Sequence, residues 1–307
     1  MQRIRVGLGP LTENDVVAVA RGGAGVELTA EALDAVAASR AIVEALADDA
    51  QPHYGISTGF GALATKHIPA EQRTQLQQSL IRSHAAGSGP EVEREVVRAL
   101  MLLRLSTLAT GRTGVRTQTA QALTALLDKA ITPVVREFGS LGCSGDLAPL
   151  AHVALALLGE GEVRDANGEL MPAGVALTAA GLQPVTLAEK EGLALINGTD
   201  GMLGQLLLAC HDLDLLLRTA DLTASMSVEA MLGTDRVFAE DLQALRPQLG
   251  QGVAAETMRA MKAGSQIIAS HAGGAPDSTG VVGGGTAAWP YVQDAYSMRC
   301  APQVAGA

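Results

Sequence analysis

The segment from Asp200 to Met231 contains no proline, and it constrains the fold of this 307-residue chain more than any other stretch. A helix of that length exceeds the roughly 8–20 residues of a typical globular helix. Its apolar residues are interrupted by His211, Asp212 and Asp214, so it lacks the uniform hydrophobicity of a transmembrane helix. We therefore predict one long helix here that forms the spine of a packed core.

The composition favours further helices around this spine. Hydrophobic residues make up 48% of the chain, with Ala and Leu prominent, whereas aromatic residues make up only 2%. Ala and Leu are strong helix formers, and a chain of this length can bury a sizeable core. We expect a mainly α fold, with a small mixed α/β N-terminal region followed by long packed helices.

Charge and cysteine usage exclude several classes of function. The formal net charge is −10 and no basic cluster is present, which argues against nucleic acid or an anionic membrane as a partner. Cys143, Cys210 and Cys300 stand at unrelated spacings that form neither a zinc site nor a disulfide framework. The N-terminus lacks the shape of a signal peptide. We expect a cytoplasmic protein without a bound metal.

Local patterns place the shorter elements. Strands are predicted at Ile4–Leu8 and Val26–Leu28, and Thr29 has the character of an N-cap for a helix that ends near Ala47. Asn167 and Gly168 predict a two-residue hairpin turn. Periodic apolar residues predict the remaining helices, at 70–86, 92–110, 115–130 and 254–270. Residues 272–288 are rich in Gly, Ser, Thr and Ala and are expected to form a loop.

The most informative motif lies in residues 139–150 (GSLGCSGDLAPL), around the triplet Cys143, Ser144 and Gly145. Local propensities predict a loop, an N-cap at Ser144 or Asp146, and a helix that follows directly. The Gly-x-Ser-x-Gly pattern of a hydrolase nucleophile and the Gly-Lys-Ser/Thr ending of a phosphate loop are both absent. A thiol nucleophile at Cys143 remains an alternative, as does self-cyclisation of the small-residue triplet with loss of water.

Four segments together resemble one family. They are residues 54–61 (YGISTGFG), 83–89 (SHAAGSG), 139–150 with 197–199 (NGT), and 293–303 (QDAYSMRCAPQ). In this order they resemble the ammonia-lyases that use a methylidene-imidazolone group, and the resemblance covers essentially the whole chain. It implies the long-helix fold of the aromatic ammonia-lyases, with an N-terminal region in residues 1–198 that carries the self-cyclising triplet and the start of the central long-helix bundle in residues 199–307.

The resemblance implies a specific fate for the triplet. The amide nitrogen of Gly145 attacks the carbonyl carbon of Cys143, and loss of two waters gives a 4-methylidene-imidazol-5-one ring whose methylidene comes from Ser144. Family members more often have Ala at the position of Cys143, but only its backbone enters the ring. No external cofactor is then needed. Ammonia elimination calls for such an electrophile, because acid–base groups contribute only about 10²–10⁴-fold each.

The same resemblance assigns roles around the triplet. Tyr54 is the expected base for the β-proton, and Tyr296 is a second candidate that the sequence does not separate from it. A phenol titrates near pH 10 or so when unperturbed, so a basic role requires a lowered pKa. Ser83 followed by His84 matches the histidine-specific members, which assigns His84 to imidazole recognition. On local grounds, the tyrosines are packing residues and His84 is a partner of a helix C-terminus.

Substrate-binding roles fall on three further residues. The Asn197 amide is expected to hydrogen-bond near the imidazolone or the substrate amine, and Gln293 to bind or polarise the substrate. Arg299 follows Tyr296 by three positions, which places both on one helix face, and a guanidinium can clamp a carboxylate with two parallel hydrogen bonds. The local alternatives are a turn residue for Asn197 and a surface ion pair for Arg299. The remaining histidines and the arginines Arg104, Arg112 and Arg116 are expected to be structural, surface or ion-pairing residues.

The implied activity is elimination of ammonia from L-histidine to give trans-urocanate, within histidine degradation, by a homotetramer. A phenylalanine or tyrosine ammonia-lyase, or an aminomutase of the same family, is the alternative within the enzyme class. Family members are longer and continue past residue 307 with further long helices. An alternative of a different class is therefore a catalytically incomplete fragment or interaction subunit, which a complementing C-terminal chain would complete.

Overall fold

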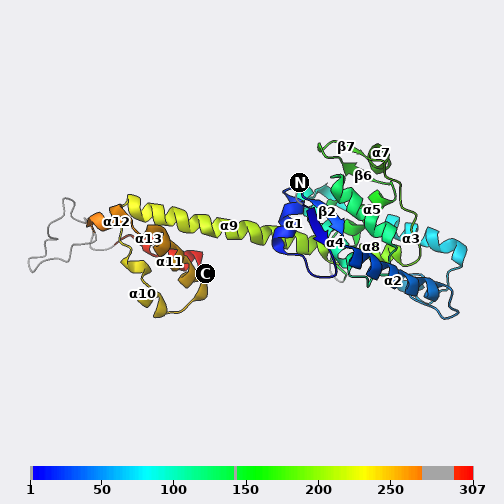
Figure 1. Ribbon diagram of the computed structural model, residues 1–307, viewed down its shortest axis with the longest axis horizontal. Helices are drawn as coiled ribbons and strands as arrows, with labels where there is room; N and C mark the ends of the chain where they lie inside the picture. Colours follow the sequence, from blue (N-terminus) through cyan, green and yellow to red (C-terminus); the bar gives the residue numbers. More distant parts are fainter. Residues whose placement is uncertain (1–2, 142–143, 272–293, 307) are drawn as a thin grey trace, which may run out of the picture. The chain divides into compact units, whose positions relative to one another are not determined.

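The computed structural model describes residues 3–141, 144–271 and 294–306, and these residues form a mainly α structure (Figure 1). The chain divides into two compact units, Met1–Ala209 and Cys210–Ala307. The mainly α class and the mixed N-terminal region are as expected from the sequence. The division falls within the long helix, whereas the sequence placed it at the start of that helix.

The N-terminal elements confirm the two predicted strands and the helix after Thr29, and they add a helix, α1, that the sequence analysis did not predict. They are β1 (Arg3–Val6), α1 (Glu13–Ala20), β2 (Gly25–Leu28) and α2 (Ala30–Ala47). The two strands pair in parallel, with Ile4 opposite Val26, and both of these side chains are buried. The Thr29 hydroxyl accepts a hydrogen bond from the Ala32 amide at 3.2 Å, so it caps α2 as predicted.

A set of packed helices forms the core of the first unit. They are α3 (Ala70–His84), α4 (Arg94–Ala109), α5 (Thr117–Asp128), α6 (Leu147–Leu157) and α8 (Glu191–Ile196). The central α4 packs against α1, α2 and α5, and its buried face includes Leu100, Leu105 and Leu108. Next to it, α6 packs against α3 and α8. The elements that carry His84, the triplet and Asn197 therefore share one core.

Small antiparallel sheets connect these helices. One pairs β3 (Ser88–Glu91) with β5 (Arg136–Phe138), and the other orders β4 (Thr132–Pro133), β6 (Glu162–Arg164) and β7 (Leu170–Pro172) side by side. The hairpin between β6 and β7 turns where the sequence predicts, at Asn167 and at Gly168, whose φ is +86°. The connection is longer than the predicted two residues, because the strands end at Arg164 and resume at Leu170. The short helices η1 (Gly61–Leu63) and α7 (Ala173–Ala179) complete the first unit.

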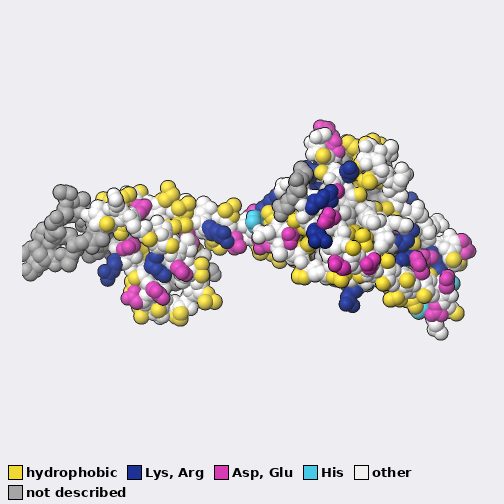
Figure 2. Space-filling view, in the orientation of Figure 1, with side chains coloured by type: hydrophobic (Ala, Val, Ile, Leu, Met, Phe, Trp, Pro, Cys, Tyr) yellow, Lys and Arg dark blue, Asp and Glu magenta, His cyan; other side chains and the backbone are white. Residues whose placement is uncertain are grey.

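The long helix α9 (Asp200–Ala230) runs unbroken over 31 residues, which confirms the predicted helix. Its role as the spine of a packed core stays a prediction, because most of its side chains are exposed in this chain. Near its start it packs tightly against α4, since a Cβ added to Gly204 would lie 3.0 Å from the Cβ of Ala99. Further along, Leu206, Leu215 and Leu216 are at least 60% exposed. Figure 2 shows apolar side chains on the molecular surface in this part of the chain.

The second unit holds shorter helices around a small core. They are η2 (Arg236–Phe238), α10 (Glu240–Ala244), α11 (Leu249–Lys262), α12 (Gln266–His271), α13 (Tyr296–Arg299) and α14 (Ala301–Ala305). The prediction of one helix over 254–270 is wrong, because Gly264 takes a φ of +78° and separates α11 from α12. The predicted loop 272–288 lies outside the described residues. Within the described part of the chain, no helix combines the length and apolar character needed to cross a membrane.

Candidate active site

Gly145 sits in a tight turn that only glycine fits. Its φ is +81°, and its carbonyl oxygen accepts a hydrogen bond from the Leu141 amide at 3.2 Å. A Cβ at this position would lie 2.8 Å from Cγ2 of Thr199 and 3.0 Å from Cε of Met202. Ser144 lies half-buried in the same turn, while Cys143 lies outside the described residues. Both the left-handed backbone and the lack of room therefore require glycine at the third position of the triplet.

Asp146 ties this turn to the start of α9. Its side chain is buried, and one carboxylate oxygen accepts hydrogen bonds from the amides of Gly201 at 2.7 Å and Met202 at 3.0 Å. The other oxygen accepts from the Ser140 hydroxyl at 2.7 Å. Asp146 occupies the N-cap position of α6, as one local prediction has it, but its carboxylate caps α9 instead. Its partners lie 55 and 56 residues away, so the sequence does not reveal this role.

Arg104 anchors the segment that carries Asn197. Its guanidinium is buried, pairs with the Asp200 carboxylate, and donates to the carbonyl oxygens of Ala194 at 3.1 Å and Asn197 at 3.2 Å. Burial raises the pKa of Asp200, and the neighbouring guanidinium opposes that rise. The prediction of an ion-pairing role for Arg104 is confirmed.

Asn197 itself lies next to the triplet. Gly198 pairs with Gly145 in a short parallel bridge, and the Asp146 amide donates to the Gly198 carbonyl at 2.9 Å. The Asn197 side chain is exposed at the C-cap of α8. Its backbone is therefore held firmly while its amide remains available to a ligand.

Tyr54 lies in an exposed loop that is fastened to the start of α8. Its side chain is 47% exposed, and the phenol oxygen accepts from the Gly61 amide at 3.3 Å. Lys190, which directly precedes α8, donates from Nζ to the Tyr54 carbonyl at 3.3 Å and from its amide to Gly55 at 3.0 Å. Burial lowers the pKa of Lys190. Because Asn197 directly follows α8, these contacts link the Tyr54 loop to the triplet through one short helix.

His84 ends α3 with its ring orientation fixed. Its Nδ1 lies 2.9 Å from the Leu80 carbonyl oxygen and 3.1 Å from the Ser83 hydroxyl oxygen. A carbonyl oxygen can only accept, so Nδ1 carries the proton, and Nε2 of the neutral ring is an acceptor. Both residues of the Ser83-His84 pair thus contribute to this arrangement.

The loop after His84 meets the segment that enters the triplet. A Cβ on Gly139 would lie 3.3 Å from the Cα of Gly87, and the Gly87 amide donates to Nε2 of His152 at 3.2 Å. His152 belongs to α6, and burial together with the nearby Arg136 lowers its pKa. Since Nε2 already accepts this amide, His152 has a structural role here, in line with the expectation for it.

Tyr296 and Arg299 belong to the second unit. The Arg299 guanidinium lies 4.3 Å from the centre of the Tyr296 ring, so the two share a helix face as predicted. Nε of Arg299 is buried and has no hydrogen-bond partner among the described residues, and Tyr296 is 67% exposed. Gln293 lies outside the described residues. Ser144, Gly145, Asn197, Tyr54 and His84 all belong to the first unit, where the structure brings Gly145 and the Asn197 segment into direct contact.

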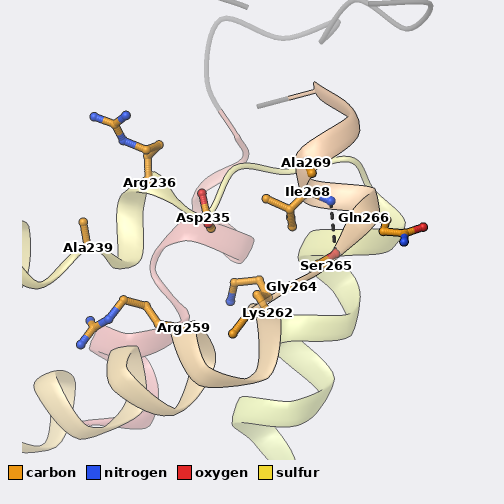
Figure 3. A pocket seen from close by; sticks show the side chains of 11 residues that line it. Asp235, Arg236, Ala239, Arg259, Lys262, Gly264, Ser265, Gln266, Ile268 and Ala269 are labelled. Carbon is orange, nitrogen blue, oxygen red and sulfur yellow. Dashed lines mark hydrogen bonds between the residues drawn. The ribbon is translucent and has the colours of Figure 1, made fainter. Parts of the chain in front are cut away.

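A cavity of about 540 Å³ in the second unit holds none of the motif residues (Figure 3). Lys262 on its wall is 4% exposed, and its ammonium lies 4.2 Å from the centre of the Phe238 ring. Burial lowers the pKa of Lys262 to about 8. The contact with the ring makes Lys262 part of the packing of this unit. Within the described residues, no cluster of His, Cys, Asp and Glu side chains is suited to a metal ion.

The known sequences that this chain resembles belong to one family. The family model for aromatic amino acid lyases matches residues 11–307. A histidine ammonia-lyase from Streptomyces avermitilis is 57% identical over 307 residues, an alignment that covers all of this chain and 57% of that protein. A histidine ammonia-lyase from Gloeobacter violaceus is 48% identical, over 97% of this chain and 55% of its own length. The chain thus spans little more than half the length of these relatives.

Solved structures agree with this grouping. Tyrosine aminomutase from Streptomyces globisporus matches with a TM-score of 0.86 and 35% identity, over 99% of this chain and 58% of that one. Histidine ammonia-lyase from Trypanosoma cruzi matches with a TM-score of 0.82 and 34% identity, over 99% of this chain and 53% of that one.

Proposed function

We propose a function from the premise that this chain belongs to the aromatic amino acid lyase family: it is a carbon–nitrogen lyase that eliminates ammonia from L-histidine to give trans-urocanate. The observation that carries the proposal is Gly145, held at φ +81° beside Gly198 with no room for a side chain. Such a position suits a triplet that forms an internal electrophile.

The residues that would hold this electrophile are Cys143, Ser144 and Gly145. Once formed, the 4-methylidene-imidazol-5-one group supplies an electrophilic carbon that makes the substrate amine a better leaving group. Asp146 fixes the C-terminal side of the triplet through its hydrogen bonds to Gly201 and Met202. No external cofactor is required.

Tyr54 is the proposed base for the β-proton. Its phenol is exposed and accepts one backbone hydrogen bond from Gly61, which orients the oxygen without blocking it. The contacts of Lys190 hold the backbone of the loop in place. Tyr296 is the second candidate for this proton transfer.

His84 is the proposed recognition group for the substrate imidazole. With its proton on Nδ1, its Nε2 can accept a hydrogen bond from the N–H of a bound imidazole. A substrate ring without an N–H donor would leave this acceptor unpaired, which disfavours phenylalanine. Histidine is therefore the substrate that this side chain fits best.

The remaining contacts would orient the amino acid. Arg299 is proposed to clamp the carboxylate, since its guanidinium is already stacked on Tyr296 and loses little freedom on binding. The exposed Asn197 amide is proposed to bind near the substrate amine, and Gln293 to bind or polarise the substrate.

A second candidate is an aminomutase, which returns the ammonia to the β-carbon. It is favoured by the match to the tyrosine aminomutase structure, at a TM-score of 0.86. The two functions differ in their products. Incubation with histidine, tyrosine and phenylalanine in turn separates them, because an aminomutase yields a β-amino acid and a lyase yields the unsaturated acid.

Assembly and location are proposed from the family. A cytoplasmic homotetramer would cover exposed apolar side chains on α9 such as Leu215 and Leu216. The alternative is an incomplete subunit that a complementing C-terminal chain completes.

Urocanate absorbance after addition of histidine tests the proposal directly. The purified chain, alone or mixed with a C-terminal fragment of a relative, is expected to generate this absorbance band. No absorbance in either condition would overturn the lyase proposal. Activity that appears only with the fragment would identify the incomplete-subunit alternative.

A further inference from the structure

Three elements meet at Gly87, just after His84. A Cβ on Gly87 would lie 3.0 Å from Nε2 of His152 on α6 and 3.2 Å from the Cβ of Arg136 on β5. On its other side, a Cβ on Gly139 would lie 3.3 Å from the Cα of Gly87. The loop that follows His84 therefore packs closely against the segment that enters the triplet.

One side-chain hydrogen bond fastens this junction. The Gly87 amide donates to Nε2 of His152 at 3.2 Å. A backbone amide can only donate, so Nε2 must be unprotonated and the ring neutral with its proton on Nδ1. Partial burial and the positive charge of Arg136 both favour this neutral form.

We propose that His152 is a positioning residue for substrate recognition: by accepting the Gly87 amide, it holds the loop that directly follows His84 at a fixed place beside the segment that enters the triplet. The inference rests on the proposed role of His84, which touches the substrate, whereas His152 acts through the backbone. His152 lies less than two helical turns after Asp146, the N-cap of α6. One helix therefore anchors both the triplet and the loop that follows His84.

The loop makes this anchor necessary. Between His84 and β3 it contains only three residues, two alanines and Gly87, whose side chains offer no polar anchor. Two local hydrogen bonds also constrain it, from the Ala85 amide to the Ile81 carbonyl at 3.0 Å and from the Ala86 amide to the His84 carbonyl at 2.8 Å. Loss of the His152 acceptor would therefore release the His84 side of the site and leave the triplet unchanged.

A matched pair of variants tests the acceptor. His152→Gln keeps an oxygen acceptor at about the reach of Nε2, and His152→Met keeps a similar volume without it. We expect the KM for histidine to rise about 3–10-fold in His152→Met, the range for one lost hydrogen bond. The kcat should change less, the intact mass should still show loss of two waters, and His152→Gln should stay close to the unchanged protein. A KM in His152→Met equal to that of the unchanged protein, or equal losses in the two variants, would overturn the proposal.

A measurement on the unchanged protein keeps the inference testable if activity is lost altogether. The ¹⁵N spectrum of the His152 ring should show Nε2 unprotonated and Nδ1 protonated, and the Gly87 amide should exchange with solvent faster in His152→Met. A protonated Nε2, or unchanged exchange at Gly87, contradicts the positioning role. Neither readout depends on turnover, so failure of the lyase proposal itself remains distinguishable.

Discussion

At the residue scale, Gly145 is constrained by both conformation and space. Its left-handed backbone costs other residues roughly 1 kcal/mol or more, and Thr199 and Met202 leave no room for a Cβ. Gly23 offers a natural comparison, since its φ is +65° but no atom lies within 4 Å of an added Cβ. The pair separates backbone strain from steric exclusion.

Gly145→Ala is expected to lower the free energy of unfolding by about 2–4 kcal/mol, because strain and overpacking add. Gly23→Ala should cost only about 1 kcal/mol, from strain alone. Denaturant unfolding of the two variants measures both values. Equal costs would mean that the space around Gly145 is not restrictive.

The candidate site could be predicted from the sequence only in part, because some of its residues depend on partners that are distant along the chain. His84 and Gly145 lie in motifs whose residues are close along the chain. Asp146 and Arg104 work through partners 55 and 96 residues away, and no local pattern encodes such a pairing. A charged residue beside a motif is only a weak indication of such a role.

At the scale of elements, the N-terminus of α9 depends on a carboxylate from another helix. The first amides of a helix lack intrahelical partners, and Asp146 satisfies two of them. Local rules place Asp146 correctly at the start of α6 but cannot say which helix it caps. The periodic pattern does not predict the break between α11 and α12, where Ala263 is extended and Gly264 takes a φ of +78°. A single glycine inside such a pattern does not reveal which backbone conformation it adopts.

Asp146→Ala should lower the free energy of unfolding by about 2–4 kcal/mol, since it leaves two amides and the Ser140 hydroxyl without their acceptor. Asp146→Asn keeps one acceptor oxygen and should cost less. Chemical denaturation of both variants gives the comparison. A loss below about 0.5 kcal/mol in Asp146→Ala would contradict the capping role.

At the scale of the whole molecule, each of the two units has its own core, and the core of the second is small. It consists of Val228, Phe238, Ala255, Met258 and Ile268. The unit nevertheless buries the amine of Lys262 against Phe238. The long helix and the helical class followed from composition and the absence of proline. The sequence does not predict which side chains remain exposed on α9, because exposure depends on packing between distant segments.

Lys262 makes the stability of this unit depend on pH. The pKa of Lys262 is lowered from 10.5 to about 8 in the folded chain, so between these values the unfolded chain binds more protons. The free energy of unfolding should therefore rise as the pH increases from about 8 to 10.5. Lys262→Met should be more stable than the unchanged protein at pH 7, with an advantage that shrinks by pH 10 or so. Denaturant unfolding at both pH values measures this, and a constant difference between the two proteins would contradict it.

The central claim is that Cys143, Ser144 and Gly145 form an internal electrophile, and intact mass spectrometry of the purified chain tests it most directly. The unchanged protein should be lighter than its sequence mass by two water molecules, whereas Ser144→Ala should retain its full mass. An unchanged protein at full sequence mass, or a Ser144→Ala variant with undiminished lyase activity, would contradict the account.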